Sequence, residues 1–118
     1  MSDAAPLRAW RFYVEDMAVF CQKVLDYTAG LDKDAFATNP MCVDATVRNL
    51  ELIGEAATHV PPEVRNQAPD VPWRQVVATR NLLIHGYLGI DMDTLWSIVQ
   101  TDIPRLLVGL QPLRSASP

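Results

Sequence analysis

Four polar residues close to residue 85 have types and a spacing suited to cutting RNA. Arg80, Asn81, His85 and Tyr87 lie within eight residues of one another. A ribose 2′-hydroxyl can attack the adjacent phosphorus when one group accepts its proton and another protonates the leaving 5′-oxygen, and imidazole titrates in the range that either role needs. A guanidinium can hold two phosphate oxygens and stabilise their charge. A symmetric dimer would supply the second imidazole for the two proton transfers.

The same segment also has an ordinary structural interpretation. Judged by spacing alone, an ion-paired arginine and a histidine at a helix end are commoner than a catalytic pair. Tyr87 would then be an amphipathic ring at the edge of the core.

A second group of charged residues lies on the preceding long helix. Glu51 and Glu55 are four residues apart, and like charges at that spacing disfavour an isolated helix. Arg48 can offset one carboxylate and Arg80 the other, so these residues are candidate supports for the site, with a solvated surface network as the alternative. We place His59 off the face of the two carboxylates and find no third ligand at a suitable spacing, so we expect no metal ion.

Length and composition restrict the class of protein. The chain has 118 residues, ten Lys plus Arg, fourteen Asp plus Glu and a net charge of −4, which fits one domain over 1–118 and argues against a broad basic face for nucleic acid. No apolar run approaches the roughly 20 residues of a membrane span, and Met1 to Trp10 lacks the pattern of a secretory signal. We therefore expect a cytoplasmic protein, with Cys21 and Cys42 as free thiols.

Apolar spacing and capping residues predict an all-α bundle of four main helices plus short helices. The main helices are expected to begin at Pro6, Pro40, Trp73 and either Asp91 or Asp93, and to end near Thr28, His59, Gly86 and Leu110. Asp32 and Asn39 are expected as caps, with a short helix through Ala37 and one short turn within Glu63 to Gln67. Pro104 should kink or split the last helix, and Ser115 to Pro118 should form a disordered tail.

The expected third main helix has a charge on its apolar stripe. The stripe comprises Trp73, Val76, Val77, Arg80, Leu83, Ile84 and Tyr87. A guanidinium cannot lose its charge, so its burial needs a carboxylate, a carbonyl or a phosphate as partner. On the helix before it, Gly54 would let another backbone come close.

The segment Arg80-Asn81-x-x-x-His85-x-Tyr87 resembles the RX4HXY motif of HEPN domains, specifically those of the HepT toxin type. Further blocks, from about residue 10 to 110, are similar to that family in order and spacing. They are Tyr27-Thr28-Ala29-Gly30-Leu31, the segment from Arg48 to Ala56, Pro72-Trp73, Gly89-Ile90-Asp91 and Asp102-Ile103-Pro104.

The resemblance implies a HEPN-like homodimer whose motifs line a cleft between protomers. It also implies the toxin of a type VII (HepT/MntA-like) toxin–antitoxin system, a metal-independent endoribonuclease without cofactors in which Arg80 and His85 are catalytic and Asn81 supports the motif. An MntA-type nucleotidyltransferase antitoxin would silence it by adding AMP to Tyr87, which places phosphates where RNA must bind. We expect neither DNA nor a membrane as partner.

Two other functions remain open at this point. The chain could be a non-catalytic HEPN subunit that binds nucleotide or a partner in a nucleotidyltransferase complex. It could also be a structural dimer in which Arg80 pairs with Glu55 or Glu51, so that its replacement would leave a buried carboxylate unpaired.

Overall fold

The chain is helical through most of the residues that the computed structural model describes, 4–86 and 90–115, and these ranges contain no β-strand. None of the described helices is both long and apolar enough to cross a membrane. The elements in chain order are α1 (Ala4–Thr28), α2 (Lys33–Ala37), α3 (Pro40–Thr58), α4 (Pro62–Arg65), α5 (Trp73–Gly86), α6 (Met92–Ser97), the π-helix η2 (Ile98–Asp102), α7 (Ile103–Gly109) and α8 (Gln111–Arg114). The predicted all-α class is confirmed.

Asp and Asn side chains begin three of these helices. Asp32, Asn39 and Asp91 each accept a hydrogen bond from the backbone N–H three residues further along the chain. These bonds satisfy donors that a helix start leaves without an intrahelical partner. At Asp91, the bond from the Thr94 N–H also lowers the carboxyl pKa from its ordinary value. The capping residues predicted from the sequence are confirmed, and Asp91 rather than Asp93 is the cap of α6.

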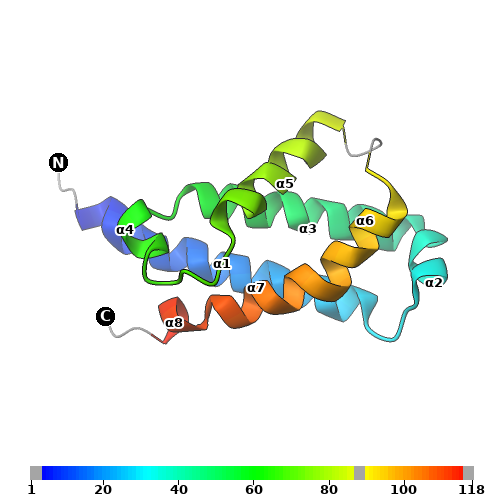
Figure 1. Ribbon diagram of the computed structural model, residues 1–118, viewed down its shortest axis with the longest axis horizontal. Helices are drawn as coiled ribbons and strands as arrows, with labels where there is room; N and C mark the ends of the chain where they lie inside the picture. The colour runs from blue at the N-terminus through cyan, green and yellow to red at the C-terminus, as the bar shows by residue number, and fades with distance from the viewer. Residues whose placement is uncertain (1–3, 87–89, 116–118) are drawn as a thin grey trace.

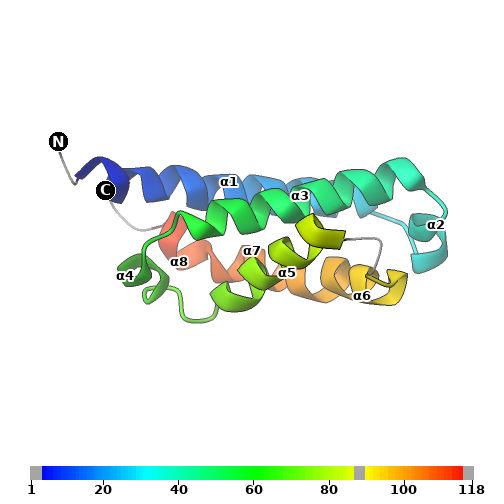
Figure 2. The same cartoon turned by 90° about the horizontal axis from the view of Figure 1, so that it is seen from above.

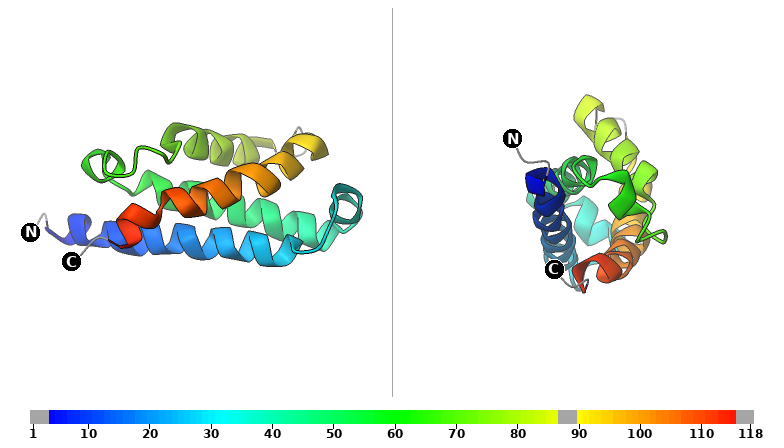
Figure 3. Two further views of the ribbon diagram at one scale, coloured as in Figure 1. Left: turned by 60° about the horizontal axis from the view of Figure 1, so that its bottom comes forward. Right: turned by 90° about the vertical axis from the view of Figure 1, so that its left-hand side faces the viewer.

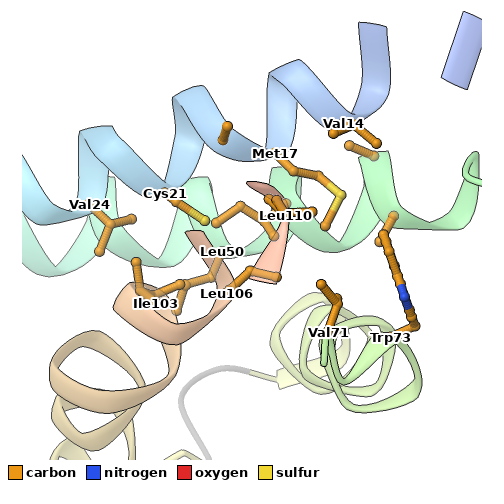
Figure 4. Packing of buried hydrophobic residues seen from close by; sticks show 14 of the residues in the cluster. Val14, Met17, Cys21, Val24, Leu50, Val71, Trp73, Ile103, Leu106 and Leu110 are labelled. Atoms are coloured by element: carbon orange, nitrogen blue, oxygen red, sulfur yellow. The ribbon is translucent and has the colours of Figure 1, made fainter. Parts of the chain in front are cut away.

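The core forms where α1, α3 and α7 meet. Helices α1 and α3 run antiparallel and side by side (Figure 2), and α7 packs against α1. Their buried side chains face one another in the centre of the bundle (Figure 4). The buried apolar residues of these three helices are Trp10, Val14, Met17, Ala18, Cys21, Val24, Cys42, Val47, Leu50, Ile53, Ala56, Ala57, Ile103 and Leu106. Burial of this apolar surface is the main favourable contribution to folding.

The predicted last helix is divided. The Ile103 N–H donates to the Ile98 carbonyl five residues back, which makes η2 a turn wider than an α-turn. Pro104 follows directly and has no N–H to donate. Helix α7 then ends at Gly109, and the separate short helix α8 was not predicted.

The proline-rich segment between α3 and α5 is held by two side chains. The Arg65 guanidinium donates to the carbonyl oxygens of Val60 and Ala57 at 2.9 and 2.8 Å. The Trp73 indole N–H donates to the Ala68 carbonyl at 3.2 Å. These bonds satisfy backbone acceptors in the last turn of α3 and after it, and they fix the start of α5.

Helix α5 packs mainly against α3, and the contact is centred on a glycine. A Cβ atom at Gly54 would lie 2.1 Å from Arg80 Cβ and 3.1 Å from the Val76 carbonyl oxygen. The expectation that Gly54 lets another backbone come close is therefore confirmed. Beyond this contact the C-terminal end of α5 projects from the bundle (Figures 1 and 3).

The apolar stripe predicted for α5 is only partly buried. Trp73 and Leu83 are buried, but the assignment of Ile84 to the buried face is wrong, because its side chain is 49% exposed. Ile84 follows the buried Leu83 by one residue, about 100° further around α5, so its side chain leaves the helix on another side. Tyr87, also assigned to the stripe, lies outside the described residues.

We expect Gly54→Ala to lower the free energy of unfolding by about 1–3 kcal/mol, because the new methyl group meets the Cβ of Arg80 rather than a movable side-chain end. Gly86→Ala is the matched control, since a Cβ there meets nothing within 4 Å and the backbone does not have a positive φ. Urea unfolding of the two variants measures the difference. A Gly54→Ala protein as stable as the control would contradict the close packing of α3 and α5.

Candidate functional site

The guanidinium of Arg80 lies between α5 and α3 and is held by two partners. Its Nη2 donates to Glu55 Oε2 at 2.6 Å, and its Nη1 donates to Asn81 Oδ1 at 2.9 Å. The Arg80 side chain is 28% exposed, and its Nε is buried without a hydrogen-bond partner among the described residues. The carboxylate partner that the sequence required for this charge is thus Glu55, and part of the cation remains open to solvent.

Glu55 belongs to a row of polar side chains on α3. The His59 Nε2 lies 3.9 Å from Glu55 Oε1, and the His59 ring stacks on Tyr13 of α1 with centroids 4.4 Å apart. The expectation that His59 lies off the face of Glu55 is therefore wrong: residues four apart on a helix are neighbours on one face. Neither His59 nor Tyr13 was predicted near the site, although the spacing of Glu55 and His59 contained the signal.

The other expected ion pair lies one turn earlier on α3. Arg48 Nη1 is 3.4 Å from Glu51 Oε1, and the Arg48 side chain is largely exposed. Arg48 thus offsets Glu51 as anticipated, while Arg80 pairs with Glu55 and not with Glu51. Glu55 is half exposed, so the expectation that loss of Arg80 would leave a buried carboxylate is corrected: water can solvate this one.

His85 is not brought together with Arg80 in the described structure. It lies exposed in the last turn of α5, one residue before the helix ends at Gly86. Five residues correspond to about 140° around a helix and about 7.5 Å along it, so the two side chains leave α5 in different directions. One copy of α5 therefore does not point both groups at the same atom.

The two cysteines are buried free thiols, as expected from their spacing. Burial raises the pKa of the Cys21 thiol to about 12, which leaves it protonated and a poor nucleophile. Within 4–86 and 90–115, no group of three or more His, Cys, Asp and Glu residues is arranged to hold a metal ion.

The described site offers a fixed cation for an anionic ligand and a solvent-accessible imidazole. The Arg80 guanidinium suits a phosphate because it presents its N–H donors in one plane. A neutral imidazole accepts a proton and an imidazolium donates one, and histidine side chains supply both forms near neutral pH. Together these groups suit an acid–base reaction at a phosphodiester.

An all-helical bundle with Arg80, Asn81 and His85 on one short helix has the features of a HEPN-type protein. A family model described as "Ribonuclease HepT-like" matches residues 17–113 of this chain. The chain belongs to the ribonuclease HepT-like family.

Curated relatives match most of the chain. It is 38% identical over 94 residues to a protein of Methanocaldococcus jannaschii named "Putative RNase", covering 80% of this chain and 86% of the relative. It is 34% identical over 107 residues to the "Probable ribonuclease HepT" of Thermococcus cleftensis, covering 91% and 97%. No solved structure gives a match.

We expect Glu55→Gln to lower the free energy of unfolding by about 1 kcal/mol, because it removes the charge that faces the partly buried Arg80. Glu51→Gln is the matched control on the same helix, and its well-solvated partner Arg48 should limit its effect to less than about 0.5 kcal/mol. Urea unfolding at low and high salt measures both variants. Equal effects of the two substitutions would show that the Arg80–Glu55 pair has no special role in stability.

Proposed function

We propose that this chain is a metal-independent endoribonuclease and the toxin of a type VII, HepT/MntA-like toxin–antitoxin pair. The observation that carries this proposal is the partly exposed Arg80, fixed by Glu55 and Asn81, on the same helix as an exposed His85 in a chain of the HepT-like family. The names of the relatives add support, since both relatives described above carry "RNase" or "ribonuclease" in their names. Such a toxin acts on RNA in the cytoplasm.

In the proposed reaction, the 2′-hydroxyl of a ribose attacks the neighbouring phosphorus. A neutral imidazole accepts the hydroxyl proton as the new P–O bond forms, and a second imidazole, in its protonated form, gives its proton to the 5′-oxygen as the bond of that oxygen to phosphorus breaks. The products are a 2′,3′-cyclic phosphate and a free 5′-hydroxyl. Arg80 donates N–H groups to the phosphate oxygens, whose charge grows in the transition state.

The site we propose is shared by two copies of the chain. A homodimer brings two α5 helices together and so supplies two imidazoles and two guanidinium groups. The divergence of Arg80 and His85 around α5 supports this arrangement, because one chain does not bring both groups to the same phosphodiester. The exposed apolar side chains of Leu82 and Ile84, 52% and 49% exposed on the projecting end of α5, support contact with a second copy.

Glu55 and Asn81 would hold Arg80 ready for the substrate. Keeping the cation in one place before RNA binds reduces the ordering that binding must supply. A phosphate approaching from solvent meets a guanidinium whose direction is already set by two hydrogen bonds. We assign Glu55 and Asn81 as positioning residues for Arg80. The Arg48–Glu51 pair lies one turn away on α3 and forms no ion pair with Arg80.

We further propose that a nucleotidyltransferase antitoxin silences the enzyme by transferring AMP from ATP to the phenol oxygen of Tyr87, with loss of the phenol proton and release of pyrophosphate. The residue lies two positions after His85 in the sequence. Added phosphates would bring negative charge to the neighbourhood of Arg80 and His85 and would repel the phosphates of RNA.

Purified wild-type protein, free of added nucleotide, should cut RNA in the presence of EDTA. We expect Arg80→Ala and His85→Ala each to slow cleavage by at least about 100-fold, because each removes a group that acts on the phosphate or its protons. Lys23→Ala, an exposed cation on α1, is the control and should cut at the wild-type rate. Gel analysis of a labelled RNA and the phosphate form at the new 3′-end measure the reaction. Intact RNA, with an effect only on a partner's activity, would favour the non-catalytic subunit instead.

Mixed dimers test whether the site is shared. Wild-type and His85→Ala chains are co-expressed with different tags, and dimers that carry one chain of each kind are isolated. Because the proposed reaction uses the imidazoles of both chains, we expect these mixed dimers to cut RNA nearly as slowly as the His85→Ala homodimer. Mixed dimers with about half of the wild-type activity would show that one chain supplies a complete site.

Co-expression with the neighbouring nucleotidyltransferase gene should add AMP to the protein. We expect intact-mass measurement to show the added AMP masses in the wild type and to show none in Tyr87→Phe, which lacks the acceptor oxygen. Tyr27→Phe is the matched control, an exposed tyrosine on α1 that should leave the modification unchanged. Masses that persist in Tyr87→Phe would assign the modification to another residue.

A further inference from the structure

A groove with a positively charged lining lies next to the candidate site. It has a volume of about 410 Å³ and is formed by the end of α3, by α4 and by one face of α5. The lining residues are Thr58, Arg65, Arg74, Val77, Ala78 and Asn81, with no carboxylate among them. Two other grooves on the described surface both include Asp70. A local excess of positive charge thus occurs in a chain whose net charge is −4.

One of the two arginines is fixed in place. The Arg65 guanidinium donates to the carbonyl oxygens of Ala57 and Val60 and lies 5.5 Å from the centroid of the Trp73 ring. These two hydrogen bonds use two of the five N–H donors of an arginine. Arg65 lines the groove, so a ligand there meets a cation that is already held in place.

The other arginine, Arg74, has no ion-pair partner among the described residues. Arg74 is exposed in the first turn of α5, and no carboxylate in the described parts of the chain lies within ion-pair distance of it. A solvated, unpaired guanidinium attracts anions at little cost, because it has no partner to give up.

The groove leads to the proposed catalytic arginine. Arg74 and Asn81 are seven residues apart on α5, which places them on the same face and about 10.5 Å apart along the helix axis. Asn81 in turn accepts the hydrogen bond from Arg80 Nη1 at 2.9 Å. A chain of phosphates that reaches Arg80 can therefore continue along this face of α5 to Arg74 and Arg65.

We propose that this groove binds the sugar–phosphate backbone of the RNA strand on one side of the bond that is cut. Arg74 and Arg65 contact phosphates, and they fix the strand relative to Arg80 without reading its bases. This inference rests on the proposed ribonuclease function and names the part of the protein that holds its substrate. A non-specific contact of this kind strengthens binding for every sequence and weakens as salt rises.

RNA binding by protein that cannot cut tests the proposal. Fluorescence anisotropy of a labelled single-stranded RNA is measured with His85→Ala and with His85→Ala/Arg74→Ala over a range of salt concentrations. We expect the added Arg74→Ala change to weaken binding about fivefold. The negative slope of log affinity against log salt should become shallower by about 0.7 for each phosphate that the protein no longer neutralises. Arg74→Lys in the same background should retain most of the affinity.

Arg105→Ala in the same background is the matched control. Arg105 is an exposed arginine on α7 whose groove also contains Asp70 and Asp102, and its replacement removes the same unit of charge. It should leave RNA affinity within about twofold. Size-exclusion chromatography of each variant verifies that its oligomeric state equals that of the parent.

The outcomes separate this proposal from the ribonuclease function. Unchanged affinity and salt slope in Arg74→Ala, an equal loss of affinity in Arg105→Ala, or a parent that binds no RNA at low salt would overturn the groove assignment. A loss of binding to the nucleotidyltransferase alone, with RNA affinity intact, would assign the groove to a protein partner and overturn it as well. If His85→Ala binds RNA through Arg74 but the wild type cuts none, the groove assignment stands and the ribonuclease proposal fails.

Discussion

The charge of Arg80 is the constraint around which α3 and α5 are arranged. A guanidinium keeps its proton throughout the physiological pH range, so a helix that turns one toward the bundle must provide an anion on the facing helix. Glu55 supplies that anion, and Gly54, its neighbour in sequence, removes the side chain that would keep the helices apart. Two adjacent residues of α3 thus make the contact with α5 possible: Glu55 balances the charge of Arg80, and Gly54 leaves room for the Arg80 side chain.

This contact also determines where the rest of α5 lies. Arg80 fixes the middle of the helix, and the turns that follow it project from the bundle with His85 in the last one (Figure 1). A firmly held cation and an imidazole at an open helix end make an incomplete acid–base site in a single chain. Under the proposed function, a second chain completes it, and the first turns of α5 guide the substrate toward it.

Local features were predictable from the sequence and long-range ones were only partly so. The caps Asp32 and Asn39 act on donors three residues away, so the sequence specifies them almost completely. The ion pair of Arg80 was also predictable, because a fixed charge on an apolar stripe requires a counter-charge. The exposure of Ile84 was not, since an apolar stripe does not show which part of its width faces the other helices. His59 was within reach of the sequence, because spacing by four residues alone makes it a neighbour of Glu55.

The π-helix η2 sets the rotational phase of the end of the chain. The buried residues Leu95, Val99 and Ile103 are four residues apart, and on a regular α-helix each such step would move the side chain about 40° around the helix axis. After Ile103, the spacing to the buried residues Leu106 and Leu110 is three and then four, which keeps them on one side of an α-helix. The wider turn of η2 compensates for this rotation, so the buried residues of α6 and those of α7 both face the core. Deleting one residue there would rotate α7 by about 100° and turn Leu106 outward, so the length of η2 is constrained more tightly than its composition.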